Sequence, residues 1–168
     1  TFVRGMAYGT DADTTTSGAA TTLASAVHQQ ITGAISAQEA ASFTTMNISG
    51  ASDLTLAGGA TLSVDGILKS GANGAEISGG TGITTANANA DMVIATGAGD
   101  SLTISTPILA NGTSSIVKTG AGTLTLSAAN TITGGIYLDE GQLNINNAGA
   151  LGTVASRLTI NEGTVIDN

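Results

Sequence analysis

Cysteine and tryptophan are absent from this chain of 168 residues, and proline occurs once, at Pro107. The absence of cysteine excludes a disulfide framework and any metal site built from thiolates. Only two phenylalanines and two tyrosines are present, so alanine, valine, isoleucine and leucine have to supply most of the 41% hydrophobic content. A core with so few large side chains has to be narrow.

Positive charge is also scarce, because four lysines and arginines stand against twelve acidic residues and leave a net charge of −8. No basic stripe can neutralise a phosphate backbone, so we expect no nucleic-acid partner. The single histidine, His28, cannot supply a multi-histidine metal site. No apolar run reaches the roughly 20 residues of a transmembrane helix, so we expect no membrane insertion by this segment. Because the chain starts at Thr1 rather than methionine, we expect a mature form, a processed product or a cut piece.

Glycine is abundant, with 24 residues, and is accompanied by much threonine, serine, alanine and asparagine. Glycine, threonine and asparagine are poor helix formers, and this composition favours short β-strands joined by tight turns. Pairs of apolar residues separated by one position recur at intervals of roughly 15 to 25 residues, as in solenoid repeats. These pairs are Leu54/Leu56, Leu102/Ile104, Leu124/Leu126, Leu143/Ile145 and Leu158/Ile160.

This periodicity predicts an all-β protein in which residues 43–168 form a parallel β-helix, or β-solenoid. Each coil would be a bent ribbon with one apolar side, and stacking the coils would close a narrow core. A β-sandwich of hairpins is the rival fold, since it also uses short alternating strands. The sheets of a sandwich lie about 10 Å apart and are normally filled by larger side chains than these, which favours the solenoid.

The N-terminal quarter of the chain has a different pattern. Residues 1–22 are predicted to be an extended strand followed by a linker, because residues 11–22 are rich in threonine, serine, aspartate and glycine. Residues 23–42 are predicted to be a short capping helix, in which apolar side chains recur every four residues. One face of the strand carries Phe2, Arg4, Met6 and Tyr8, and the helical pattern consists of Leu23, Val27, Ile31 and Ile35.

Residues 116–153 contain the phrases K-T-G-A-G-T-L-T-L, A-N-T-x-T-G-G, E-G-Q-L-N-I-N and N-A-G-A-L-G in succession. This stretch closely resembles the autotransporter-associated β-strand repeat, also called the passenger-associated transport repeat. The resemblance implies a right-handed parallel β-helix in a large secreted passenger of Gram-negative and related bacteria, used in surface display, adhesion or fibre building. It implies no general catalytic residues. The chain departs from the family pattern at Ile132, where an aromatic residue is frequent.

No group of residues points to catalysis, a cofactor or a metal. Asp139 and Glu140 are the candidate carboxylates, but neighbours on a strand point to opposite faces. Asp100 alone supplies too few oxygens for a calcium ion, which takes about six to eight. The glycines of K-T-G-A-G and T-G-G are explained by turns with positive φ. Asparagines at turns or outward positions are expected to stabilise the coils, namely Asn130, Asn144, Asn146, Asn147 and Asn161.

We therefore expect a structural protein without enzymatic activity or cofactor, located at the cell surface or secreted. The expected helix would cover one end of the solenoid, whereas residues 163–168 end on an apolar β phrase without a cap. Copies of the chain would then join head to tail into a fibre through the N-terminal strand and the open C-terminal edge. The alternative is an adhesin module that binds host or environmental glycans or matrix proteins. The residues predicted to make the assembly are Phe2, Arg4, Met6, Tyr8, Val165 and Ile166.

Overall fold

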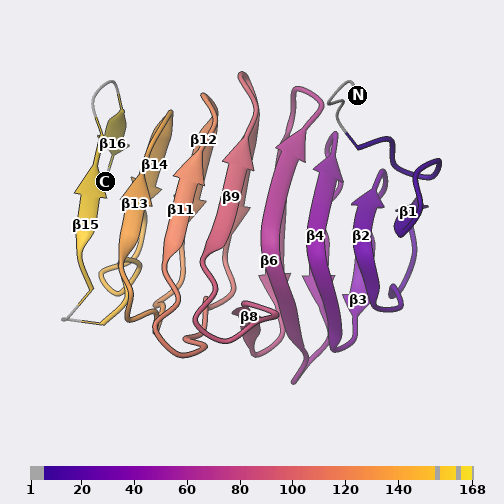
Figure 1. The fold of residues 1–168 in the computed structure, drawn as a ribbon, viewed down its shortest axis with the longest axis horizontal. Helices are drawn as coiled ribbons and strands as arrows, with labels where there is room; N and C mark the ends of the chain where they lie inside the picture. The colour runs from indigo at the N-terminus through magenta and orange to yellow at the C-terminus, as the bar shows by residue number, and fades with distance from the viewer. Residues whose placement is uncertain (1–5, 154–155, 162–163, 168) are drawn as a thin grey trace.

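The computed structural model describes residues 6–153, 156–161 and 164–167, which form a parallel β-solenoid (Figure 1). Its strands form two sheets, of nine and seven strands, that enclose the core. Sheet A contains β1 (Thr14–Ser17), β2 (Ala26–Ile31), β4 (Ala41–Ser49), β6 (Thr61–Ser70), β8 (Gly82–Thr84), β9 (Met92–Thr96), β11 (Ile116–Thr119), β13 (Ile136–Leu138) and β15 (Leu158–Ile160). Sheet B contains β3 (Ile35–Gln38), β5 (Leu54–Leu56), β7 (Gly74–Gly79), β10 (Ser101–Ile104), β12 (Thr123–Leu126), β14 (Gln142–Ile145) and β16 (Val165–Asp167).

The core is built from columns of stacked apolar side chains, which agrees with the narrow interior expected from the composition. Successive coils pair in parallel, so an inward side chain lies on the inward side chain of the next coil. Phe43 is the one fully buried aromatic side chain in the described part of the chain. Burying each leucine or isoleucine stabilises the fold by about 1.5–3 kcal/mol. Two columns in sheet B are Leu102/Leu124/Leu143 and Ile104/Leu126/Ile145.

The predicted helix over residues 23–42 is wrong, because this range contains β2 and β3 and the start of β4. β1 pairs with β2, and β2 pairs with β4, so the coil begins at β1. No described residue is helical, and no described segment is therefore a helix that could cross a membrane.

The burial of individual side chains explains why the helical pattern is misleading. Val27 is 45% exposed whereas Ile31 and Ile35 are buried, so the residues spaced by four do not share one face. On β2 the buried residues are Gln29 and Ile31, which follow the period of two that a strand requires. Residues 23–42 therefore form strands, because stacking these side chains on the next coil stabilises the strand more than the weak helical pattern favours a helix.

The N-terminal segment also differs from the prediction, since residues 8–10 form a turn rather than an extended strand. The amides of Thr10 and Asp11 both donate to the carbonyl oxygen of Ala7, at 3.1 and 2.9 Å. The Asp11 carboxylate accepts a hydrogen bond from the Ala7 amide at 2.7 Å. Local bonding by an aspartate side chain commonly stabilises such turns. The strand β1 then forms inside the range predicted to be a linker.

Two glutamine side chains close the N-terminal end of the core in place of a helix. Gln38 is fully buried, and its Oε1 accepts from the Leu23 amide at 2.8 Å while its Nε2 donates to the Leu23 carbonyl at 3.0 Å. This pair of bonds imitates a bridge between two strands. Gln29, also buried, donates to the Gln30 carbonyl at 2.6 Å and to Ser17 Oγ at 3.2 Å. The first coil is therefore closed by polar groups whose hydrogen bonds are satisfied.

The C-terminal coil leaves apolar side chains uncovered. Ile160 stacks on Leu138 and Ile166 on Leu143, which places both in the core columns. Ile160 is nevertheless 52% exposed, because no described coil lies beyond it. Val165 on β16 is exposed as well.

Asn130 joins three coils through its side chain, although the sequence suggested a turn or outward position. It is buried, its Oδ1 accepts from the Ile108 amide at 2.8 Å, and its Nδ2 donates to the Ala150 carbonyl at 2.5 Å. Both backbone groups depend on this side chain for a partner. The amide is therefore a strut between neighbouring coils.

Replacing Asn130 with alanine is expected to lower the free energy of unfolding by about 2–3 kcal/mol, because a buried amide and a buried carbonyl lose their partners. Urea denaturation followed by circular dichroism measures the change. Asn144→Ala is the matched control and should change stability by less than about 0.5 kcal/mol, since Asn144 lies on the outer face. Equal losses in the two variants would contradict the strut.

Candidate functional site

The two outer faces of the solenoid differ in chemistry. On sheet A, Val93, Val117 and Tyr137 stand in one outward column across three neighbouring coils. Val93 and Tyr137 are exposed, as is Leu68 one strand away. A contiguous apolar patch on an otherwise polar surface marks an interaction site. The outward column of sheet B over comparable coils is polar and consists of Thr103, Thr125 and Asn144.

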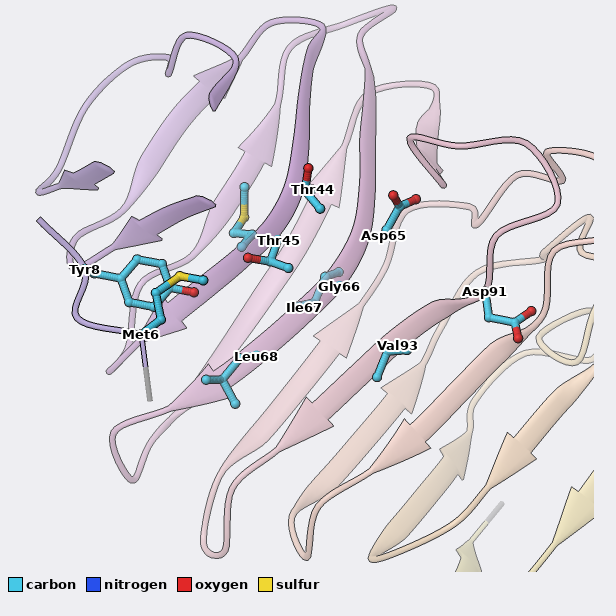
Figure 2. Close-up of a pocket in the computed structure, with 11 residues that line it drawn as sticks. Met6, Tyr8, Thr44, Thr45, Asp65, Gly66, Ile67, Leu68, Asp91 and Val93 are labelled. Carbon is cyan, nitrogen blue, oxygen red and sulfur yellow. The ribbon is translucent and has the colours of Figure 1, made fainter. Parts of the chain in front are cut away.

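A groove of about 460 Å³ opens where the apolar face of sheet A meets the N-terminal segment (Figure 2). Its concavity follows from strand geometry. The inward-outward alternation is broken on β4, where Thr44 and Thr45 are consecutive outward residues. It is broken again on the neighbouring β6 at Asp65 and Gly66. Gly66 has no side chain, so the floor of the groove is backbone there.

The two ends of the groove carry different groups. Figure 2 shows Met6 and Tyr8 at one end and Asp65 and Asp91 at the other. These carboxylates are the charged groups of the described lining. Leu68 lies between the two ends and contributes to the apolar side.

Hydrogen bonds from the next coil fix the positions of both carboxylates. Asp65 Oδ1 accepts from the amides of Ala86 and Asn87, at 2.8 and 3.2 Å, and Oδ2 accepts from Asn87 Nδ2 at 2.6 Å. Asp91 Oδ1 accepts from the Ser115 amide at 3.0 Å. The negative end of the groove is consequently preorganised.

The structure separates the residues predicted to make a head-to-tail assembly. Met6 and Tyr8 line the groove near the N-terminal end, whereas Val165 and Ile166 lie on β16 at the opposite end of the stack (Figure 1). Phe2 and Arg4 fall outside the described residues. Direct contact between the two described groups would require a second copy of the chain.

Two of the four cationic side chains lie inside the coil and are absent from the surface. Lys69 and Lys118 are both 0% exposed. The Nζ of Lys69 donates to the Ser70 carbonyl at 2.8 Å and forms an ion pair with Asp100 Oδ1 at 3.3 Å. The same carboxylate oxygen accepts from the Asn73 amide at 3.2 Å. This corner is thus held by a buried ion pair between neighbouring coils.

Lys118, near the C-terminal end of β11, binds backbone carbonyls instead of a carboxylate. Its Nζ donates to the carbonyl oxygens of Thr119, Gly120 and Glu140, at 2.9, 2.6 and 3.0 Å. Burial lowers the pKa of Lys118 from 10.5 to about 8, and the negative charge of Glu140 opposes this shift. The Glu140 carbonyl belongs to the next coil, so Lys118 links two coils.

The lowered pKa of Lys118 predicts that stability rises with pH between about 8 and 10.5. Below this window Lys118 is protonated in both states, and burial of the charge destabilises the fold. Within the window the unfolded chain binds more protons, so the free energy of unfolding increases, by about 3 kcal/mol in total. Chemical denaturation at a series of pH values should show this rise in the native chain and not in Lys118→Met. The same rise in both chains would contradict the assignment.

A repeated phrase is the sequence signal for these lysines. Lys69 and Lys118 are each followed by serine or threonine and then glycine, at residues 69–71 and 118–120. The phrase is shared but the register is not, because Lys69 pairs with Thr96 whereas Lys118 pairs with Ile94, two residues earlier on β9.

The positive φ expected for the glycines of K-T-G-A-G and T-G-G is confirmed at Gly120, with 76°, and at Gly135, with 107°. The expectation is wrong for Gly122 and Gly134, where glycine is needed because a Cβ would collide with a carbonyl oxygen of the preceding coil.

The other polar candidates have structural partners. His28 lies on β2 rather than on a helix, with Nδ1 2.8 Å from Thr45 Oγ1. Asp139 accepts a hydrogen bond from Asn161 Nδ2 at 2.6 Å. Among the residues that the structure describes, no three histidine, aspartate or glutamate side chains gather closely enough to hold a metal ion.

Comparison with known proteins identifies a family within the coil. Residues 116–145 match the family described as Passenger-associated-transport-repeat. The matched residues contain β11, β12, β13 and β14, which make up two coils. Over 57 residues the chain is 35% identical to the Adhesin BmaC autotransporter of Brucella suis biovar 1 (strain 1330), a match that covers 34% of this chain and 2% of that protein. No solved structure matches the chain significantly.

Proposed function

We propose, from the premise that residues 116–145 are a passenger-associated transport repeat, that this chain is a structural segment of a bacterial passenger protein at the cell surface or secreted. The observation that carries the proposal is the continuity of the repeat with its neighbours. β11 pairs with β9, and β14 pairs with β16, so the repeat is part of one stack with the coils on both sides. In such a stack each coil is stabilised by contacts with its two neighbours, so the elongated structure needs no contacts between distant coils.

The proposal includes a right-handed coil. In Figure 1 the chain ascends sheet A, crosses at the top to sheet B behind it, and advances from right to left. This path supports the right-handed crossover that parallel strands adopt in about 98% of cases.

A role without catalysis is part of the same proposal. Two of the three carboxylates considered for chemistry form structural bonds, Asp100 with Lys69 and Asp139 with Asn161. General acid-base chemistry requires an acid and a base that both face the substrate. In these two pairs the carboxylate is bound to a neighbouring side chain instead. The polar groups of the coil instead stabilise the stack.

Head-to-tail assembly into a fibre is the finer form of the proposal. Ile160, Val165 and Ile166 present exposed apolar surface on the last described coil. A coil stacked on them, contributed by a neighbouring copy, would bury this surface and pair the edges of β15 and β16.

Negative-stain electron microscopy and light scattering of the full chain test the assembly. Fibres with a constant axial repeat are expected, and Ile166→Asp should reduce them to short particles. Val27→Asp is the matched control, because Val27 is 45% exposed against 37% for Ile166 but lies on the side of the stack. A single-chain particle at high concentration of the unmodified chain would refute the assembly while leaving the passenger role intact.

An adhesive role is the second candidate. It is supported by the name of the similar autotransporter, an adhesin, and by the exposed apolar column on sheet A. Adhesion would use the side of the stack and therefore does not require open ends.

A further inference from the structure

We infer that the groove on sheet A binds a short peptide segment of a partner protein in which an apolar side chain is next to a lysine or arginine. The inference is independent of head-to-tail assembly, because the groove lies on the side of the stack. It goes beyond the structural role by assigning a site and the chemistry of its partner.

The apolar part of the site is a shallow, open depression lined by exposed side chains. Met6, Leu68 and Val93 are exposed on its walls, and the volume of about 460 Å³ falls within the range of ligand sites. At Gly66 the floor of the groove has no side chain of its own, and the Thr45 methyl group borders it, 3.2 Å from where a Cβ would lie. An apolar group entering the groove would remove surface from water on both partners.

The charged part of the site favours a cation beside that apolar group. Asp65 and Asp91 both lie toward one end, and the described lining contains no lysine or arginine. Lys69 is close in sequence but buries its Nζ against Asp100, so it does not neutralise the groove. Complementary charge gives such a contact orientation and a faster rate of association.

The charge of the whole chain argues against other occupants. Lys69 and Lys118 are buried, so Arg157 is the exposed cation of the described surface, against a net charge of −8 for the chain. A second copy or an acidic glycan would therefore meet repulsion at the carboxylates. A neutral glycan would find little polar surface to bind, because most of the exposed lining area is apolar. A foreign protein with a cationic and apolar segment fits both ends of the groove.

The experiment is a titration of the full chain, labelled at its leucine, valine and methionine methyl groups, with capped dipeptides observed by NMR. Acetyl-Phe-Arg-amide is expected to shift the methyl signals of Leu68, Val93 and Met6. Acetyl-Phe-Glu-amide keeps the apolar group and reverses the charge, and acetyl-Gly-Arg-amide keeps the charge alone. Both should bind at least about threefold more weakly than Phe-Arg, as expected for one exposed charge contact or one lost apolar contact.

Two variants separate the charged and apolar contributions. Asp91→Asn removes the charge and keeps the Oδ1 that accepts from the Ser115 amide, and it should weaken Phe-Arg binding roughly two- to fivefold at low salt. Leu68→Ser removes an exposed wall and should weaken both phenylalanine peptides. Thr125→Ser, on the outer face of sheet B, is the control and should leave binding unchanged.

Three results would overturn the inference. The first is the absence of chemical shift changes at the groove methyl groups at about 10 mM peptide, a concentration at which even a weak site would be partly occupied. The second is equal affinity for Phe-Arg and Phe-Glu. The third is unchanged affinity for Phe-Arg in Asp91→Asn. A monomeric chain that binds Phe-Arg would support the groove while refuting the fibre.

Discussion

Lys69→Ala is expected to lower the free energy of unfolding by about 3–5 kcal/mol, because it leaves the Asp100 carboxylate buried without its partner. The side chains of the pair are 0% and 4% exposed, and Nζ lies 3.3 Å from Oδ1. Lys69 also lies in register between Ile48 and Thr96, so losing its aliphatic stem opens a cavity between coils. Urea denaturation followed by circular dichroism measures the loss.

A paired variant separates the charge from the packing. Lys69→Met with Asp100→Asn removes both charges, keeps most of the stem volume and retains an oxygen for the Asn73 amide. This double variant should lie within about 1–2 kcal/mol of the native chain, because replacing both members of a buried ion pair is far less destabilising than removing one. A Lys69→Ala chain as stable as the native one would refute the buried pair.

Gly120→Ala is expected to lower the free energy of unfolding by about 2–4 kcal/mol, from backbone strain and overpacking together. Gly120 has a φ of 76°, and a Cβ added there would collide with the carbonyl oxygen of Thr96 on the preceding coil. The close approach of the two backbones is what lets the coils stack at this corner. Thermal or urea denaturation measures the effect.

Gly99→Ala is the matched control, because Gly99 has a φ of 77° but no atom within 4 Å of an added Cβ. This substitution should lower the free energy of unfolding by only about 1–2 kcal/mol, which is the cost of a left-handed backbone conformation at a residue other than glycine. The difference between the two variants therefore reports the contact with the preceding coil. No difference would mean that the corner tolerates a methyl group and that the stacking is looser than described.

The central part of the fold could be predicted because its pattern is local. Leu124 and Leu126 alternate with Thr123 and Thr125, and the structure buries the first pair and turns the second outward. The same alternation recurs in most coils, so the parallel stack follows from spacing and composition. The family resemblance at residues 116–153 points to the same architecture.

The N-terminal coil could not be predicted because polar side chains are buried in its core. Gln29 and Gln38 fill the core there through hydrogen bonds to the preceding coil, Gln38 to the backbone of Leu23 and Gln29 to the Thr15 carbonyl and the Ser17 hydroxyl. A hydropathy pattern treats both as exposed, which leaves Ile31 and Ile35 to suggest a helical period. The partners that bury these amides are known only once the coils are stacked.

The candidate site was hidden for a related reason. Met6 and Tyr8 were predicted to be functional, but their position beside Asp65 and Asp91 depends on a turn and on consecutive outward residues in two neighbouring strands. Lys69 and Lys118 appear in the sequence as two of four cations, and their burial leaves the surface more acidic than the composition suggests. The available signal was the phrase of lysine, serine or threonine, and glycine that recurs at residues 69–71 and 118–120.

The central claim is that this solenoid is a structural passenger segment displayed outside the cell. The most direct measurement is labelling of intact cells of the producing bacterium, and of their culture medium, with an antibody raised against residues 6–153. The account predicts labelling without permeabilisation, at the cell surface or in the medium, while an antibody against a cytoplasmic protein gives none. Labelling that appears only after the cells are lysed would contradict it.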